Sequence, residues 1–489
     1  MHTKILKSKK GISRLFSVVF AFVVVPLALY VTTGRVLADV SEDFEQAQVY
    51  DDNGKYPQAV QIYENIITEH SGTEHALRAQ NRLTRMHVFT GHSGAAQTAC
   101  QQLIDNFSQY DGIEKAICEV ADSYLTLKPQ RALELYQYVI DTWSDPNDEM
   151  WAQSGVVKAN VMLGNESSAQ AAYGTLLTQY DEHTNICEAV YDVGDTYRFK
   201  SLQKALDKYN YAINTWPDYD AWIDEDDAIL RQTNLVILRL SVGDESGAQA
   251  AYEDLLTTFS GNYKLPGAVL DIANACLVSG NTQKATELYQ YTKTQWSGTG
   301  HHIWAEAGLV NTNIATGNDP NDTGIDELLT DFSEDSDLAK AVYTVTEQYH
   351  YVALTRKSQG NSKQAGQYFA KIVSLGRKLI KDLLGTSDPD LSSEVRYLMG
   401  QSYQKLGDFG KAIEYYEQVV AGWPDGAHAW SAQFRIGRSW EQLEKAGAVT
   451  RSEAQSNIRY AYQKVLQDYP HCPAVKAAKA WLQSHGKSN

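Results

Sequence analysis

The stretch MGQSYQKLGDFGKAIEYYEQVVAGWP, residues 399–424, contains the pattern that decides the fold. Ala412 follows Gly400 by twelve positions, and Tyr416 follows Ala412 by four. A small residue and an aromatic residue four positions apart lie on one face of a helix. Gly407 stands between the two halves of the stretch, where a glycine ends a helix in a left-handed cap. The stretch therefore predicts two antiparallel helices that touch through small residues and pack around large aromatic side chains.

This spacing resembles the tetratricopeptide repeat, a helix-turn-helix unit. The positions that carry the resemblance are Gly400, Tyr403, Ala412, Tyr416 and Pro424, and the departure is Arg396, where the family usually has an aromatic residue. The resemblance implies an all-α fold, a right-handed α-solenoid of stacked helix pairs. It implies little about a ligand, because this repeat is a scaffold for many different partners.

The same Gly-x4-Ala spacing recurs along the chain, which predicts further helix pairs. It is found at Gly54/Ala59, Gly91/Ala96, Gly164/Ala169, Gly243/Ala248, Gly280/Ala285, Gly360/Ala365 and Gly407/Ala412. Two further copies, with Ala132 and Ala205, have a shorter turn. Counting two degraded copies, we expect about eleven helix pairs of the tetratricopeptide type, stacked into an elongated superhelix with a concave groove.

The copies differ from one another, and the differences divide the chain into segments. Similar copies alternate within residues 39–317, so the repeating unit there is a pair of repeats 73 to 80 residues long. Residues 318–390 contain a polar loop and longer helical patterns, which predict an irregular segment with degraded repeats. Residues 391–489 then hold the clean repeat, one more copy with a longer loop, and a short helix that would cap the exposed apolar end.

Eight tryptophans form four pairs across the loops that join one repeat to the next, and two interpretations remain open. The pairs are Trp143 with Trp151, Trp216 with Trp222, Trp296 with Trp304, and Trp423 with Trp430. In one interpretation each pair packs at the junction between repeats, because tryptophan buries a large area. In the other, Trp151, Trp222, Trp304 and Trp430 form an aromatic edge that stacks on sugar rings, and the protein binds carbohydrate.

The N-terminus has the order of features of a secretory signal peptide. A basic region that ends at Arg14 precedes an apolar run over residues 15–31, and Val36-Leu37-Ala38 forms a small-residue cleavage site. We predict residues 1–38 as a signal peptide, with an uncleaved membrane anchor as the alternative. The remaining chain would in either case be exported, to the periplasm or outside the cell.

The chain is acidic, with a formal net charge of −17. Residues 1–38 hold six Lys or Arg and no Asp or Glu, so the exported part would carry −23. This charge disfavours nucleic acid and anionic membrane surfaces as partners, because both would repel it. Two explanations stay open, which are solubility of a large exported protein and recognition of a basic protein partner.

No motif in the chain predicts catalysis, a metal or a cofactor. Nucleophile elbows, phosphate-binding loops and zinc-protease motifs are all absent from the sequence. The five cysteines are widely spaced without a Cys-x-x-Cys pair, and Cys100 and Cys118 are either buried apolar residues or a disulfide between successive helices. We therefore expect a protein that is not an enzyme and takes no cofactor, metal or small-molecule substrate. An enzyme with its site in residues 318–390 is the less favoured alternative.

The resemblance places ligands of such arrays on the concave face, which the first helix of each pair forms. In the clean repeat the candidate ligand-binding residues are Tyr397, Gln401, Gln404 and Lys405. They do not reproduce the Lys and Asn set with which some family members bind a terminal carboxylate. Together these features predict an exported, non-catalytic scaffold that holds protein partners in a bacterial cell envelope.

Overall fold

The computed structural model describes residues 40–51, 56–143, 145–217, 219, 223–318, 323–384, 388–470 and 472–485. All of their regular structure is helical, which confirms the all-α prediction. The predicted signal peptide, the turn at Gly54, Trp222 and the polar loop at 319–322 lie outside the described residues. In the described part of the chain, no helix combines the length and the apolar character needed to span a membrane.

The described helices form eleven antiparallel pairs followed by one closing helix, as the repeat count predicted. The first helices of the pairs are residues 40–51, α3 (Glu74–Phe89), α5 (Ile113–Tyr124), α7 (Pro146–Leu163), α9 (Ile186–Tyr197), α11 (Glu225–Val242), α13 (Leu265–Ser279), α15 (His301–Thr316), α17 (Leu338–Ser358), α19 (Pro389–Leu406) and α21 (Ala429–Lys445). The second helices are α2 (Tyr56–Glu69), α4 (Ser93–Phe107), α6 (Pro129–Thr142), α8 (Glu166–Gln179), α10 (Leu202–Thr215), α12 (Glu245–Thr258), α14 (Thr282–Gln295), α16 (Thr323–Asp331), α18 (Ser362–Lys378), α20 (Phe409–Gly422) and α22 (Arg451–Asp468). The closing helix is α23 (Val475–His485).

The turn inside each pair follows from its sequence. Gly407 ends α19 with a φ of 86°, and Asp408 then caps α20 by accepting a hydrogen bond from the backbone N–H of Lys411 at 3.1 Å. The equivalent glycines all have φ between 76° and 86°, as the sequence predicted; they are Gly91, Gly164, Gly243, Gly280 and Gly360. A left-handed glycine thus ends the first helix, and in four pairs the next side chain caps the second helix: Asp244, Asn281, Asn361 and Asp408.

Buried tyrosines hold the helices together against glycines. A Cβ atom added to Gly400 would lie 2.6 Å from the ring of Tyr416, which is fully buried. Within a pair the same contact joins Gly194 to Tyr209, and between pairs it joins Gly308 to Tyr289. Only a residue without a side chain lets the helix backbone approach the ring this closely.

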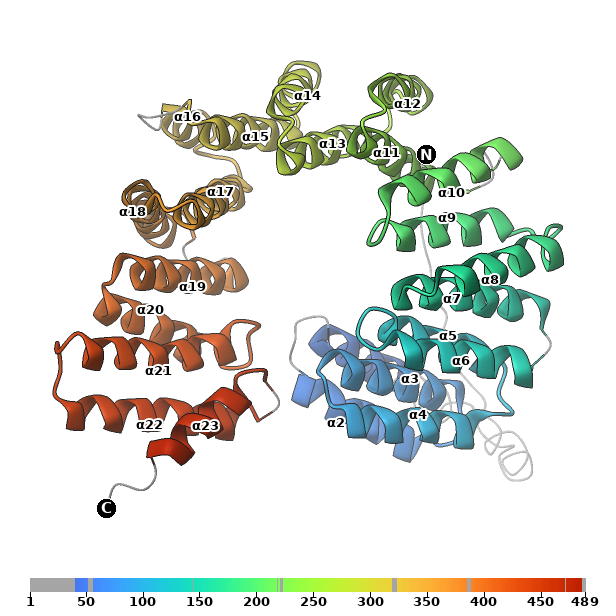
Figure 1. Ribbon diagram of the computed structural model, residues 1–489, viewed down its shortest axis with the longest axis horizontal. Helices are drawn as coiled ribbons and strands as arrows, with labels where there is room; N and C mark the ends of the chain where they lie inside the picture. Colours follow the sequence, from blue (N-terminus) through green and yellow to red (C-terminus); the bar gives the residue numbers. More distant parts are fainter. Residues whose placement is uncertain are drawn as a thin grey trace, which may run out of the picture.

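The stack bends into an arch (Figure 1), in which helices up to α10 form one arm, α11–α16 the top and α17–α23 the other arm. Most first helices pack against the next first helix, as α3 does on α5, α7 on α9 and α11 on α13. Successive second helices have no comparable contact with each other. In a curved stack the layer that touches lies on the inside, so the first helices line the concave face.

The contacts between neighbouring pairs alternate along the first arm and the top. The first helices pack extensively where α3 meets α5, α7 meets α9, α11 meets α13 and α15 meets α17. At the intervening junctions the second helix packs on the following first helix instead, as α6 does on α7, α10 on α11 and α14 on α15. The packing therefore has a period of two repeats.

Residues 323–384 depart from the regular pairs. The helix α16 has only 9 residues, whereas α17 has 21, and α18 continues into the π-helical turn η2 (Leu379–Leu383). Ile325 stands where an alanine is expected, and it is buried. The apolar core nevertheless continues through this region, so the division of the chain at residues 318 and 390 stays a prediction.

Candidate functional site

The candidate site is a groove of about 530 Å³ on the concave face, between α5, α7 and α9. Its lining residues recur at a spacing of three, four or seven positions, which places them on one face of each helix. They include Lys115, Cys118 and Asp122 of α5, Trp151 and Lys158 of α7, and Glu188, Tyr191 and Asp195 of α9. The groove therefore crosses three successive pairs.

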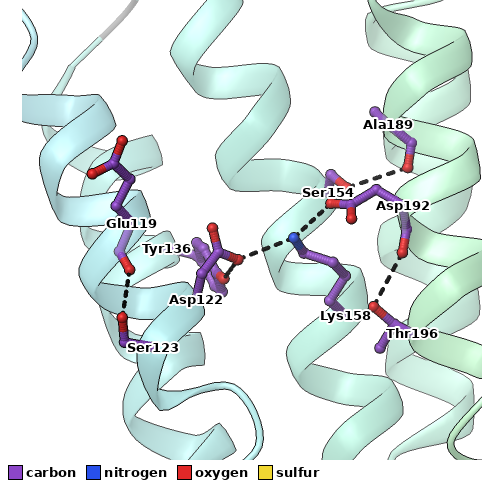
Figure 2. A network of polar contacts seen from close by, with 9 residues as sticks. All are labelled: Glu119, Asp122, Ser123, Tyr136, Ser154, Lys158, Ala189, Asp192 and Thr196. Carbon is purple, nitrogen blue, oxygen red and sulfur yellow. Dashed lines mark hydrogen bonds and ion pairs between the residues drawn. The ribbon is translucent and has the colours of Figure 1, made fainter. Parts of the chain in front are cut away.

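Lys158 lies at the centre of the groove (Figure 2), between carboxylates of the two neighbouring first helices. Its Nζ atom donates hydrogen bonds to Asp122 at 3.0 Å and to Asp192 at 2.7 Å. The lysine side chain is only 9% exposed, and its aspartate partners are 50% and 40% exposed. Burial opposes the charge of Lys158, but Asp192 and Asp122 together outweigh burial, so the pKa of the lysine is raised. The ammonium group stays charged and links α5, α7 and α9.

Tyrosine hydroxyls from the second helices reach through the pairs to this inner face. Tyr136 of α6 donates a hydrogen bond of 2.5 Å to Asp122, and Tyr209 of α10 donates one of 2.8 Å to Asp195. Because the rings are buried, their position is fixed by packing. Each hydroxyl therefore orients a carboxylate towards the groove.

The groove has more carboxylates than cations. Six carboxylates line it, against the three cations Lys115, Lys158 and Arg231. Burial and the nearby carboxylate of Glu114 raise the pKa of Asp148. Asp148 and the exposed Glu188 have no ion-pair partner among the described residues. The site therefore presents an excess of negative charge that the structure itself does not neutralise.

The four candidate residues of the clean repeat lie on α19, and the structure gives them different surroundings. Tyr397 and Gln404 are half-buried and bond to α21: the Tyr397 hydroxyl lies 2.6 Å from Ser431 Oγ, and Gln404 donates to Ser439 at 3.0 Å. Gln401 is half-buried, and Lys405 is exposed. Two of the four are thus part of the junction between repeats, and Lys405 is the one open to solvent.

The tryptophans lie where second helices pack on the following pair. Trp143, Trp216 and Trp296 follow the last residues of α6, α10 and α14, and each contacts a tyrosine edge to face with ring centroids 5.5 to 5.9 Å apart. All seven paired tryptophans that the structure describes are half-buried. For the predicted aromatic edge this includes Trp151, Trp304 and Trp430. Half-burial of these rings decides for neither interpretation, so the sugar-binding edge stays a prediction.

Sequence reasoning missed Lys158, Asp122 and Asp195 as residues of the site, although the sequence contained a signal for them. Lys158 precedes Ala169 by eleven positions, as Gln401 precedes Ala412. Asp122 and Asp195 precede their alanines by ten positions, because the turn there is one residue shorter. Comparing this position in every copy would have identified the inner face.

Two other predictions concern chemistry. Cys100 and Cys118 are both buried and are not joined by a disulfide, so the interpretation as small apolar residues holds. In the described part of the chain, no cluster of three or more His, Cys, Asp or Glu side chains has the arrangement of a metal site.

Comparison with known proteins identifies one repeat directly. Residues 393–421 match the family model of the tetratricopeptide repeat, which confirms the resemblance for that stretch. No curated protein sequence matches the chain. Among solved structures, the apo form of RapI is 13% identical and yeast Tom70 is 11% identical. The RapI match covers 70% of this chain and 99% of that chain with a TM-score of 0.35, and the Tom70 match covers 91% and 99% with a TM-score of 0.32.

A tetratricopeptide repeat protein from Parabacteroides merdae is 15% identical to this chain. That match covers 60% of this chain and 98% of the other, with a TM-score of 0.29.

Proposed function

Because residues 393–421 match the tetratricopeptide repeat and similar helix pairs recur along the described chain, we propose that this protein is a scaffold for protein partners. The first helices line a concave surface on which a partner segment can contact several repeats. Repeats of this kind act by binding proteins, and no catalytic step is part of the proposal. The concave groove between α5, α7 and α9 is the proposed binding site.

The excess of carboxylates in this groove supports a basic partner segment. Lys158 neutralises part of the charge of Asp122 and Asp192, whereas Asp148 and Glu188 have no ion pair among the described residues. A Lys or Arg side chain in the groove would supply the missing positive charge. Because the groove is half-enclosed by helices, an ion pair there is screened less than one on an open surface.

A binding experiment with charge variants tests this proposal. The probe is a fluorescein-labelled peptide of alternating Lys and Ala, and its fluorescence anisotropy is measured with the full chain. Asp148→Asn combined with Glu188→Gln is expected to weaken binding roughly two- to tenfold, because two ion pairs are lost. The control is Glu327→Gln, which removes an exposed carboxylate on α16 outside the groove. Equal affinity for the wild type and the double variant would contradict the proposal.

We also propose that the scaffold is exported to a bacterial cell envelope. The support is the order of basic, apolar and small residues over positions 4–38. Mass spectrometry of the protein purified from each cell fraction tests it, with a mature N-terminus at Asp39 as the expected result. A chain that begins at Met1 in the membrane fraction would indicate the uncleaved anchor, and one in the cytoplasm would contradict export.

A further inference from the structure

The concave face has a second charged region on the opposite arm, with the opposite sign. Lys357 lies at the end of α17, Lys405 at the end of α19, and Arg435 in the middle of α21, which are three successive first helices (Figure 1). Arg435 reaches back to α19, because its guanidinium donates to Tyr397 at 3.1 Å and to Gln404 at 3.0 Å. Lys405 follows Gln404 on α19, and the charges of Lys405 and Arg435 act on each other.

None of these three cations forms an ion pair with a carboxylate of the described residues. Lys158 in the other arm, by contrast, is held by two aspartates. Burial, Lys357 and Arg435 lower the pKa of Lys405. Burial, Lys405 and Arg435 lower the pKa of His350 on α17. The positive charges of Lys357, Lys405 and Arg435 therefore repel one another, and no carboxylate offsets this repulsion at Lys405 or His350.

Two carboxylates on α17 and α19 lie too far along their helices to neutralise the cations. Glu347 precedes Lys357 by ten residues, and Glu394 precedes Lys405 by eleven, so each pair is about 15 Å apart along its helix. That separation exceeds the Debye length of about 8 Å at physiological ionic strength. Two carboxylates lie closer in sequence, and neither forms an ion pair with these cations: Asp408 accepts a hydrogen bond from Lys411 N–H at the start of α20, and Glu441 pairs with Arg438.

We propose that Lys357, Lys405 and Arg435 form a subsite that binds an acidic segment of a protein partner. The three side chains come from three successive first helices, so an extended acidic segment that crosses these helices can meet them in turn. Nucleic acid fits less well, because the chain carries a net charge of −17.

This inference rests on the proposed scaffold function and adds a preferred direction in which a partner binds along the arch. The groove between α5 and α9 is acidic, and the cluster of Lys357, Lys405 and Arg435 is basic. A partner with a basic segment and an acidic segment would therefore bind along the arch in only one direction. Reversing the partner would bring like charges together, which disfavours that orientation.

The test uses a fluorescein-labelled peptide of alternating Glu and Ala, with anisotropy measured on the full chain. Lys357→Gln combined with Lys405→Gln changes two exposed side chains and is expected to weaken binding roughly three- to tenfold. The matched control is Lys363→Gln, an exposed lysine on the second helix α18, which is expected to bind as the wild type does. Arg435→Gln is expected to weaken binding as well, and circular dichroism shows whether that variant is folded.

The outcomes separate this inference from the proposed function. Failure of the wild type to bind the acidic peptide, or equal binding by the double lysine variant, would overturn the subsite. An equal loss with Lys363→Gln would also overturn it, because the effect would then come from net charge alone. Binding of the Lys-Ala peptide is measured in parallel, and it is expected to be the same for the wild type and the double lysine variant. If the wild type does not bind the Lys-Ala peptide, the proposed function of the acidic groove is contradicted instead.

Discussion

Substitution of Gly308 by alanine is the most direct test of how the repeats are joined. Gly308 lies in α15, and the fully buried ring of Tyr289 from α14 packs on its backbone. A Cβ atom at this position would lie 2.3 Å from Tyr289 Cε1 and 2.4 Å from Cδ1. Real Cβ atoms do not approach a ring this closely, so either the ring or the helix must move.

The expected loss in the free energy of unfolding is the steric cost of the new methyl group minus the gain in helix propensity. Overpacking of a buried site costs about 1 to 3 kcal/mol. Displacement of the ring also strains the hydrogen bond of 2.7 Å from the Tyr289 hydroxyl to Asn274, which is worth about 1 kcal/mol. Alanine is the better helix former by roughly 0.5 to 1 kcal/mol, which offsets part of the cost. The net result is a destabilisation of about 2 kcal/mol at the junction between α14 and α15.

Native-state hydrogen exchange of peptides that cover α14 and α15 measures the local stability of this junction. A local measurement is needed because a long repeat array need not unfold in one step. The control is Gly174→Ala in α8, where no atom lies within 4 Å of the new Cβ. That variant is expected to be stabilised by roughly 0.5 to 1 kcal/mol, so the two substitutions have opposite signs. Gly194→Ala, with its ring 3.0 Å away, is expected to cost less than Gly308→Ala. Equal protection of α14 and α15 in Gly308→Ala and the wild type would refute the reasoning.

Three further predictions concern caps and charges. Asp408→Ala removes the cap of α20 and is expected to lower stability by about 1 kcal/mol in urea unfolding. Lys158→Met is expected to lower the unfolding midpoint, and adding Asp192→Asn should then cost less than it does in the wild type. Burial raises the pKa of Glu347 and of Glu394 in the folded protein. The protonated forms therefore stabilise the fold fully at a pH below the ordinary glutamate pKa of about 4.3, and this stabilisation is lost as the pH rises through the raised pKa of the folded state. Replacing both by glutamine should therefore raise the midpoint of thermal unfolding at neutral pH and leave it unchanged in acid; a lower midpoint at neutral pH would contradict this.

The helix pairs could be predicted from sequence because their determinants are local. Gly407 and the equivalent glycines end the first helices at the expected positions. Ala412, which follows Gly400 by twelve residues, is fully buried as the pattern predicted. Helix caps and small-residue contacts act over a few residues, so one copy of the pattern predicts the rest. The long helices α17 and α18 were also visible as longer helical patterns, whereas the short α16 was not predicted.

The candidate site was predicted only in outline. The concave face was expected on the first helices, and Lys405 is exposed there, but Tyr397 and Gln404 bond mainly to α21. Their role depends on Arg435 and Ser439, which lie more than thirty residues further along the chain. No local pattern specifies which polar residues from two repeats will meet.

The sequence by itself determined the helix pairs, their turns and their aromatic packing, because these depend on spacings within a single repeat. Only the tertiary structure decided how charge is arranged on the concave face. Lys158 is neutralised because α5 and α9 bring Asp122 and Asp192 to it from either side. Lys405 is not neutralised, because its neighbours across the junction are Lys357 and Arg435. Electrostatic interaction depends on distance in space, and the curvature of the stack sets that distance between residues of different repeats.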